Sequence, residues 1–352
     1  MRRAPDRGAL ASSILRAQAP SGMICWFPGG HADPWNHVEA AMALAVSGRR
    51  AAATAAYRFL LASQRADGSW PAYTAADGSV EEARADTNAC CYLATGLWHQ
   101  HLVTGDAQLL EEAFPAMEAA LDFALGHRRA GGLLSWSVEG EAGAPASLLA
   151  ASCSVVRSLE AALRVAALLG ARRDEWAAAR AALAAAVRAP AGRFLDKGEF
   201  AMDWYYPVLS GALSAAEGRR LLAARWGEFV VPGAGVRCRT DRRWVTTAES
   251  AELALALVSV GRRRRAARLL ALLADKEAPG GGYLTGLVYP ERASFPEGEV
   301  SSYSAAAALL AADALAGGAT AALFAPMRRS TRSEPQEDSS SAAYSPLASA
   351  SR

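Results

Sequence analysis

The sequence predicts an all-α protein in which about six helical hairpins close into an (α/α)6 toroid. Three observations support this fold. Alanine-rich segments with helical character dominate the chain, and runs of β-branched residues are nearly absent. Pairs of such segments recur about every fifty residues, as in stacked α-hairpins. The first segment of each pair begins with polar and aromatic residues, whereas the second is mostly alanine, leucine and arginine.

The helix pairs can be followed in order along the chain, separated by turns that usually contain glycine. The first members are expected to form the inner wall of the ring, at residues 34–47, 86–103, 147–169, 204–212, 247–260 and 302–315. The outer members are expected at residues 49–64, 107–126, 174–188, 215–226 and 262–274. The N-terminal segment 5–18 could supply the missing outer partner of the sixth inner helix.

The domain prediction is a single toroid over residues 1–324, followed by a tail over residues 325–352. The composition changes in this tail to serine, proline and charged residues with few apolar ones. Such a segment cannot bury enough surface to offset the entropy of ordering it. We therefore expect a disordered tail that takes no part in catalysis.

Composition and charge exclude several classes of function. The net charge is +2, and the one basic run, 262–265, fits a solvated helix face, so no nucleic-acid partner is expected. No stretch of eighteen apolar residues indicates a membrane span. The five cysteines form no C-x-x-C pair, which predicts reduced thiols and a cytoplasmic protein. No metal site and no cofactor is expected, and the oligomeric state is left open.

The richest stretch for chemistry is residues 26–39, which read W-F-P-G-G-H-A-D-P-W-N-H-V-E. Asp33 followed by Pro34 predicts a helix start, because aspartate caps free N–H groups and proline suits the first helical position. Capping alone could explain this aspartate. The neighbouring polar and aromatic side chains go beyond what a cap needs and suit a polyhydroxylated ligand, namely His31, Trp35, Asn36 and His37.

Paired carboxylates are the strongest catalytic signal in the sequence. Cleavage of a glycosidic bond needs one acid to protonate the leaving oxygen and one carboxylate to activate water or attack carbon. Glu249 opens an otherwise apolar helix, where it could also be the glutamate of a capping box. The candidate carboxylates are Asp33, Glu39, Asp86, Asp203, Glu249, Glu252 and Glu299. Further residues expected to contact a sugar are Asn88, Trp204, Tyr205, Tyr283 and Tyr303.

The segment 64–70, Q-R-A-D-G-S-W, resembles the Q-x-x-D-G-x-W turn of terpenoid cyclases. This motif predicts a tight turn at Gly68 with Trp70 packed back on the preceding helix, which is information about fold rather than chemistry. The D-x-D-D acid cluster of squalene–hopene cyclases is absent. A toroid acting on an isoprenoid remains one alternative, and a non-catalytic glycan-binding toroid is another.

Four segments together resemble an actinobacterial family that is often labelled prenyltransferase, the methylmannose polysaccharide hydrolases. They read F-P-G-G-H-A-D-P-W-N-H-V-E-A-A-M-A-L, D-T-N-A-C-C-Y-L-A-T-G-L-W-H, A-M-D-W-Y-Y-P-V-L-S-G-A-L and W-V-T-T-A-E-S-A-E-L-A-L-A-L. The resemblance covers residues 24–315. It implies a cytosolic endo-α-mannosidase of (α/α)-barrel type that cuts α-1,4-linked 3-O-methylmannose chains. It further implies that Asp33 and Glu249 are the catalytic carboxylates.

The chain departs from this family before the last inner helix. Where the family often reads W-P-x-E-x-T-T-W, residues 295–303 read F-P-E-G-E-V-S-S-Y, so either Glu297 or Glu299 could occupy the family's position. The sequence leaves open which carboxylate is the acid. It also leaves open whether the pair lies about 6.5–9.5 Å apart, as in inverting enzymes, or about 5–5.5 Å apart, as in retaining ones.

Overall fold

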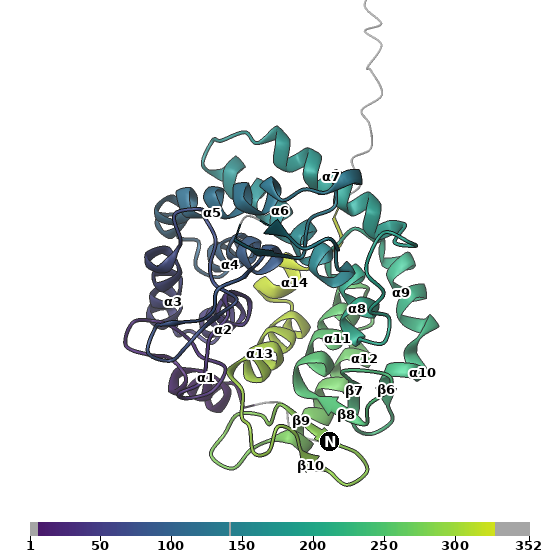
Figure 1. The fold of residues 1–352 in the computed structure, drawn as a ribbon. Helices are drawn as coiled ribbons and strands as arrows, with labels where there is room; N and C mark the ends of the chain where they lie inside the picture. The colour runs from purple at the N-terminus through teal and green to yellow at the C-terminus, as the bar shows by residue number, and fades with distance from the viewer. Residues whose placement is uncertain (1–5, 141, 328–352) are drawn as a thin grey trace, which may run out of the picture.

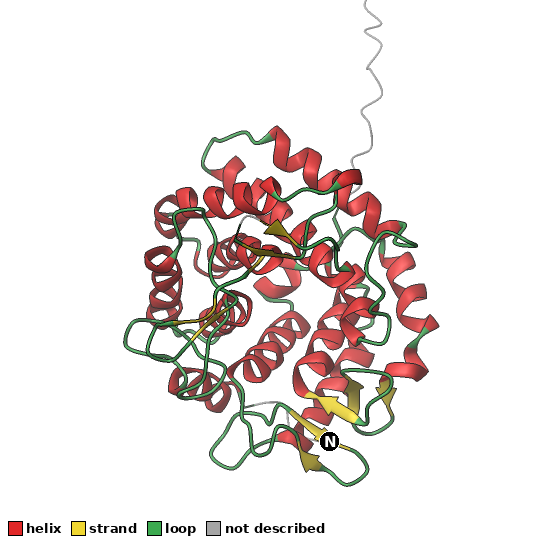
Figure 2. Cartoon of the chain, in the orientation of Figure 1, coloured by secondary structure: helices red, strands yellow, loops and turns green. Residues whose placement is uncertain are grey.

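The computed structural model describes residues 6–140 and 142–327, and their helices form two concentric rings (Figures 1 and 2). Each inner helix packs against the next one, and the last packs against the first, which closes the ring. The predicted (α/α)6 toroid is therefore confirmed. The inner helices are α2 (Pro34–Val46), α4 (Thr87–Thr104), α6 (Leu149–Leu168), α8 (Ala201–Leu209), α11 (Thr247–Ser259) and α13 (Ser302–Ala316).

The outer helices follow the expected order around the ring. The N-terminal helix α1 packs against α13, so it completes the sixth pair as predicted. The outer helices are α3 (Arg50–Ser63), α5 (Gln108–Gly126), α7 (Asp174–Arg188), α9 (Ala215–Ala224) with α10 (Trp226–Phe229), α12 (Arg263–Ala271) with η2 (Leu272–Lys276), and α1 (Arg7–Arg16). A short helix, α14 (Ala319–Leu323), packs against α4 and α13 inside the ring (Figure 1).

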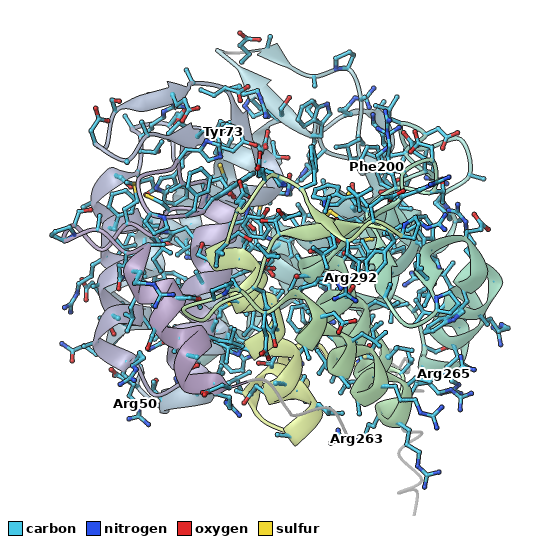
Figure 3. The ribbon with its side chains drawn as sticks, turned by 90° about the horizontal axis from the view of Figure 1, so that it is seen from below. Arg50, Tyr73, Phe200, Arg263, Arg265 and Arg292 are labelled. Atoms are coloured by element: carbon cyan, nitrogen blue, oxygen red, sulfur yellow. The ribbon has the colours of Figure 1, made fainter. Side chains whose placement is uncertain are left out.

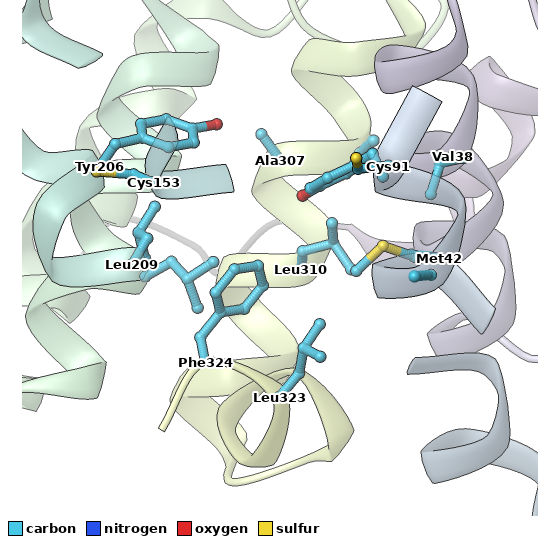
Figure 4. Packing of buried hydrophobic residues seen from close by; sticks show 14 of the residues in the cluster. Val38, Met42, Cys91, Cys153, Tyr206, Leu209, Ala307, Leu310, Leu323 and Phe324 are labelled. Atoms are coloured by element: carbon cyan, nitrogen blue, oxygen red, sulfur yellow. The ribbon is translucent and has the colours of Figure 1, made fainter. Parts of the chain in front are cut away.

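The inner helices are rich in alanine because each is enclosed on several sides. On α2, every residue from His37 to Ala45 is buried, and short side chains let the neighbouring helices approach closely. On α4, a Cβ atom at Gly96 would lie 2.5 Å from Val38, so only glycine fits that crossing. Side chains such as Val38, Leu310 and Phe324 converge inside the ring (Figure 4), which makes this part a packed core rather than a pore.

The turn at residues 64–70 has the predicted structure. The indole nitrogen of Trp70 donates a hydrogen bond to the carbonyl of Leu60 at 2.9 Å, which folds the ring back on α3. The amide of Gln64 donates to the carbonyls of Gly68 and Ala116 at 2.9 and 2.8 Å and joins the turn to α5. This motif therefore holds two neighbouring hairpins together.

Short antiparallel strands in the loops before the inner helices were not predicted from the sequence. They contain only two or three residues each, too few for an alternating pattern to be visible. The largest sheet has the order β10-β9-β8-β7-β6, one smaller sheet pairs β1 with β2, and another has β4 between β3 and β5. Their bounds are β1 (Tyr73–Thr74), β2 (Val80–Glu82), β3 (Ala85–Asp86), β4 (Ser137–Glu139), β5 (Ala142–Gly143), β6 (Val230–Val231), β7 (Gly235–Arg237), β8 (Trp244–Thr246), β9 (Gly286–Val288) and β10 (Ala293–Ser294).

The predicted tail falls largely outside the described residues, which end at Met327. The last described residue returns to the ring, because the backbone N–H of Met327 donates to the carbonyl of Gly211 at 3.2 Å. The disorder expected for residues 328–352 stays a prediction. Within the described ranges, no helix combines the length and the apolar character needed to cross a bilayer.

Candidate active site

A cavity of about 450 Å³ opens where the inner helices begin. Residues at or just before the start of each of the six inner helices line it, so the polar mouths recognised in the sequence do converge. Figure 3 shows the ring from the side. Tyr73, in the wall of the cavity, lies at one end of the molecule, and Arg50, Arg263 and Arg265 lie at the other.

Asp33 caps helix α2 and also lines this cavity. Its carboxylate accepts hydrogen bonds from the backbone N–H and the side-chain amide of Asn36, at 2.9 and 2.7 Å, and from the indole N–H of Trp26. Burial raises the pKa of Asp33, and these three donors oppose the rise without cancelling it. Capping and exposure to a ligand are therefore compatible at this residue.

Glu249 lines the same cavity from the first turn of α11. It does not form a capping box, because the hydroxyl of the N-cap residue, Thr246, accepts no backbone N–H and instead donates to the Glu249 carboxylate. The thiol of Cys238 forms a second hydrogen bond to this carboxylate. Two side-chain donors thus hold Glu249 at the cavity wall.

Deeper in the ring lie two further acidic side chains, Glu39 and Glu252. Glu252 lines the cavity as well, and its carboxylate accepts hydrogen bonds from the hydroxyls of Tyr205 and of Tyr206, the latter at 2.8 Å. Burial raises the pKa of Glu39 to about 7, and burial also raises the pKa of Glu252 well above its ordinary value. Tyr205, expected to contact a sugar, is itself fully buried and serves to hold Glu252.

Other predicted residues also reach the cavity. Trp35 and Tyr303 bring aromatic rings, while Asn36, Asn88 and Asp86 bring polar groups. The Trp35 ring is stacked on Tyr92 with centroids 4.6 Å apart, which fixes its orientation. Burial raises the pKa of Asp86 to about 6, against the opposing effect of its ion pair with Arg84.

The structure corrects three of the predicted sugar contacts. His37 is buried, and its ring nitrogens pair with the backbone N–H of Ile24 and the carbonyl of Ala56, so it joins α2 to its surroundings. Trp204 is buried and stacked on Phe229, with centroids 5.0 Å apart. Tyr283 is buried outside the cavity lining. His37 and Trp204 face the packing between helices, where an aromatic ring fills volume, whereas Tyr283 lies in the loop between η2 and β9.

Three more predicted residues lie behind the cavity wall rather than on it. His31 packs against Trp26, with ring centroids 4.5 Å apart. Asp203 accepts a hydrogen bond from the backbone N–H of Ala150 at 3.1 Å and so supports the start of α6. Glu299 accepts a hydrogen bond from the hydroxyl of Thr285, a lining residue, at 2.6 Å. Glu297 is exposed, so Glu299 is the one associated with the site.

Sequence reasoning missed four aromatic residues of the lining, which are Trp26, Tyr73, Trp136 and Trp244. Each lies in the loop that precedes an inner helix, at a variable distance from the helix start. The local sequence does not show which way such a loop folds. Their common position before α2, α4, α6 and α11 is the signal by which they could have been found.

Comparison with known proteins identifies a relative and a shared fold. The chain is 42% identical over 305 residues to the MMP endo-(1,4)-3-O-methyl-alpha-D-mannosidase of Mycolicibacterium hassiacum, a match that covers 87% of this chain and 84% of the relative. A wild-type glycosidase of known structure superposes with a TM-score of 0.71 at 18% identity, covering 88% of this chain and 96% of its own. A GH63 mannosylglycerate hydrolase from Thermus thermophilus gives a TM-score of 0.63 at 16% identity, covering 88% and 99%. No family model matches the chain.

Proposed function

Because the chain belongs to the same family as this mannosidase, we propose that it is an endo-acting hydrolase of α-1,4-linked 3-O-methylmannose polysaccharide. Membership in this family identifies the chain as a mannose-cleaving glycoside hydrolase, and the lining of the cavity suits the binding of a sugar. The cavity lining combines acidic and amide side chains with aromatic rings. This combination suits a sugar, which has hydroxyl groups as well as apolar ring faces. An isoprenoid would instead call for an apolar cavity.

We propose Asp33 and Glu249 as the catalytic carboxyls. The observation that carries this assignment is that both line one cavity although they come from the first and the fifth inner helix. Burial raises the pKa of Asp33, and a raised pKa favours the protonated form that a general acid needs. We therefore assign the role of general acid to Asp33. Glu249 acts at the anomeric carbon, as a base toward water or as a nucleophile, and the anomer of the released product distinguishes these two.

The aromatic lining suits the binding of several sugar units. Trp35, Trp136, Trp244 and Tyr303 lie in the wall around the two carboxyls. Rings of this kind stack on the apolar faces of sugars, and a methoxy group adds to the apolar surface they can cover. Such a wall can hold sugars on both sides of the bond to be cleaved, which endo cleavage requires.

The experiment that tests this function is incubation of the purified protein with methylmannose and plain α-mannan oligosaccharides, read by mass spectrometry. Wild type is expected to give shorter products, and Asp33→Asn and Glu249→Gln are expected to give none. The matched control is Asp203→Asn, because this half-buried carboxyl supports α6 without lining the cavity. Full activity in both of the first two variants would refute the assignment, and intact oligosaccharides with wild type would refute the function.

A cytoplasmic location forms part of the proposal. All five cysteines are free thiols, and four of them are buried in the ring. Free thiols persist in reducing compartments, whereas secreted proteins usually pair them. Fractionation of cells that express the protein tests this point.

A further inference from the structure

A second, much smaller cavity lies deeper in the ring than the candidate active site. Its volume of about 20 Å³ suits a single water molecule. Glu39 of α2 and Glu252 of α11 line it, together with Ser154 and Arg157 of α6. Phe324 also belongs to its lining, and Figure 4 shows this ring among the packed side chains of the core. Because Glu252 belongs to both linings, this carboxyl connects the small cavity to the large one.

Neutral donors hold both carboxyls of this small cavity. The hydroxyl of Tyr92 donates to Glu39 at 3.0 Å, and the hydroxyls of Tyr205 and Tyr206 donate to Glu252. A neutral donor orients a carboxylate but does not balance its charge. Two ionised carboxylates here would therefore need compensation from a cation.

Arg157 is the cation in the lining, and it brings one positive charge. Its side chain is buried, and the guanidinium donates to the backbone carbonyls of Leu209, Leu323 and Ala325, so it is fixed in place. The α13 residues in the lining, Ala307 and Leu310, are apolar.

The other titratable groups around the pair are Tyr92 on α4, the two tyrosines on α8, the Cys153 thiol on α6, and Asp33 and Glu249 at the helix starts. None of these adds positive charge. The carboxylate that acts on Arg157 is that of Glu160 on the same helix. Glu39 and Glu252 repel each other when both are ionised, so one proton between the two carboxyls relieves the repulsion.

The hydroxyl of Ser154 gives independent support for a water between the two carboxyls. Ser154 is 3% exposed, and its Oγ atom has no hydrogen-bond partner among the residues the structure describes. Buried polar atoms rarely stay without a partner. A water in the small cavity would provide one and would also reach carboxyl oxygens in the same lining.

We propose that Glu39 and Glu252 share one proton through a water bound by Ser154, and that the single negative charge of this pair tunes the two catalytic carboxyls. The second part rests on the proposed function, in which those carboxyls are Asp33 and Glu249. Asp33 lies near enough to Glu39 to interact electrostatically with it, and Glu249 does so with Glu252. A neighbouring negative charge disfavours ionisation, so the pair helps to keep the acid protonated. Both glutamates are thus positioning residues that act through others.

Infrared spectroscopy tests the shared proton without any substrate. At pH 7.5, wild type is expected to show the C=O stretch of a protonated carboxyl from the pair. This contribution should disappear in Glu39→Gln and equally in Glu252→Gln, because the glutamine takes the place of the protonated member and leaves the other carboxyl ionised with no like charge from the pair beside it. If the band contribution survives in either variant, the proton is not shared. Asp203→Asn serves as the control, since this residue lines neither cavity.

The water is tested by filling the small cavity. Ser154→Val removes the hydroxyl and occupies the space, so the infrared band of the pair is expected to shift in position. An unchanged band would overturn the water bridge. Infrared spectra of the three single variants, Glu39→Gln, Glu252→Gln and Ser154→Val, therefore test the shared proton and the water. This test does not require that a double variant folds.

The pH dependence of kcat/KM tests the effect on catalysis. The double variant Glu39→Gln/Glu252→Gln removes the negative charge, so the profile is expected to move to lower pH by about one unit. Each single variant keeps one charge and should leave the position of the profile in place. A double variant with the wild-type profile would overturn the tuning. If wild type cleaves no glycan at all, the proposed function fails, and the infrared result still decides whether the proton is shared.

Discussion

The indole N–H of Trp26 donates a hydrogen bond to the carboxylate of Asp33, while the same ring lines the cavity. The ring lies edge-on to Tyr303, with centroids 5.2 Å apart, so residues from opposite ends of the chain fix the geometry of the proposed acid. The donor stabilises the ionised form of Asp33 and partly offsets the effect of burial on its pKa. This contact therefore sets how easily Asp33 gives up its proton.

Trp26→Phe is expected to raise the pKa of Asp33 further, because it removes the donor and keeps the ring. A hydrogen bond to a charged group is worth about 1.5–3 kcal/mol, so the alkaline limb of the pH–rate profile should move up by about one unit or more. The matched control is Trp244→Phe, since the N–H of Trp244 donates to the carbonyl of Phe295. An alkaline limb that moves equally in both variants would contradict this role.

A substrate with a better leaving group separates the roles of the two carboxyls. Fluoride leaves without protonation, so Asp33→Asn should retain much of its activity on an α-mannooligosaccharyl fluoride while losing activity on the polysaccharide. Glu249→Gln should be inactive on both. An ion-selective electrode measures the fluoride that each variant releases. The reverse pattern would mean that Glu249 is the acid and that Asp33 acts at the anomeric carbon.

Cys238 holds Glu249 through its thiol, and it is the one cysteine of the five that is not fully buried. Cys238→Ala should lower kcat several-fold, because Glu249 keeps only the Thr246 donor, whereas Cys238→Ser supplies another donor and should retain most of the activity. Burial raises the pKa of the Cys238 thiol, so little reactive thiolate is present and iodoacetamide at pH 7 should leave wild type active. Rapid inactivation of wild type that the serine variant escapes would contradict this expectation.

Acid is expected to destabilise the fold through two buried histidines. Burial lowers the pKa of His37 and of His99 to about 4. Between about pH 6.5 and pH 4 the unfolded chain binds protons that the folded one does not, so stability rises with pH there and is lost on acidification. The loss is roughly 3 kcal/mol for each histidine. Melting temperatures measured from pH 7 to pH 4.5 should fall less steeply in His99→Gln, and parallel curves would contradict the prediction.

A comparison of alanine substitutions at two glycines distinguishes the stability cost of backbone strain from the cost of a steric collision. Gly68 and Gly78 have similar φ values, +89° and +88°, but a Cβ atom at Gly68 would lie 2.3 Å from the carbonyl oxygen of Ala119, whereas at Gly78 it would meet nothing within 4 Å. Gly78→Ala should cost about 1–2 kcal/mol of unfolding free energy, and Gly68→Ala clearly more. Chemical denaturation measures both, and equal losses would mean that the turn can move away from α5.

The sequence determined the toroid and the end of it that carries the chemistry. Helix periodicity, the fifty-residue repeat and the Q-x-x-D-G-x-W turn are local signals, and each is readable without knowing which segments meet. A carboxylate at a helix start is also a local pattern, which placed Asp33 and Glu249 among the candidate carboxylates, and the family resemblance then singled out these two. Polar residues at the start of every inner helix must meet if the ring closes.

Only the tertiary structure decided which way each side chain of these helix starts turns. His37 and Trp204 fill space between hairpins, while Trp26 and Trp136 reach the cavity from loops with no fixed spacing. The meeting of Glu39 and Glu252 at one small cavity likewise depends on residues far apart in the chain. Burial and charge balance arise when several elements come together, so a single helix in the sequence cannot reveal them.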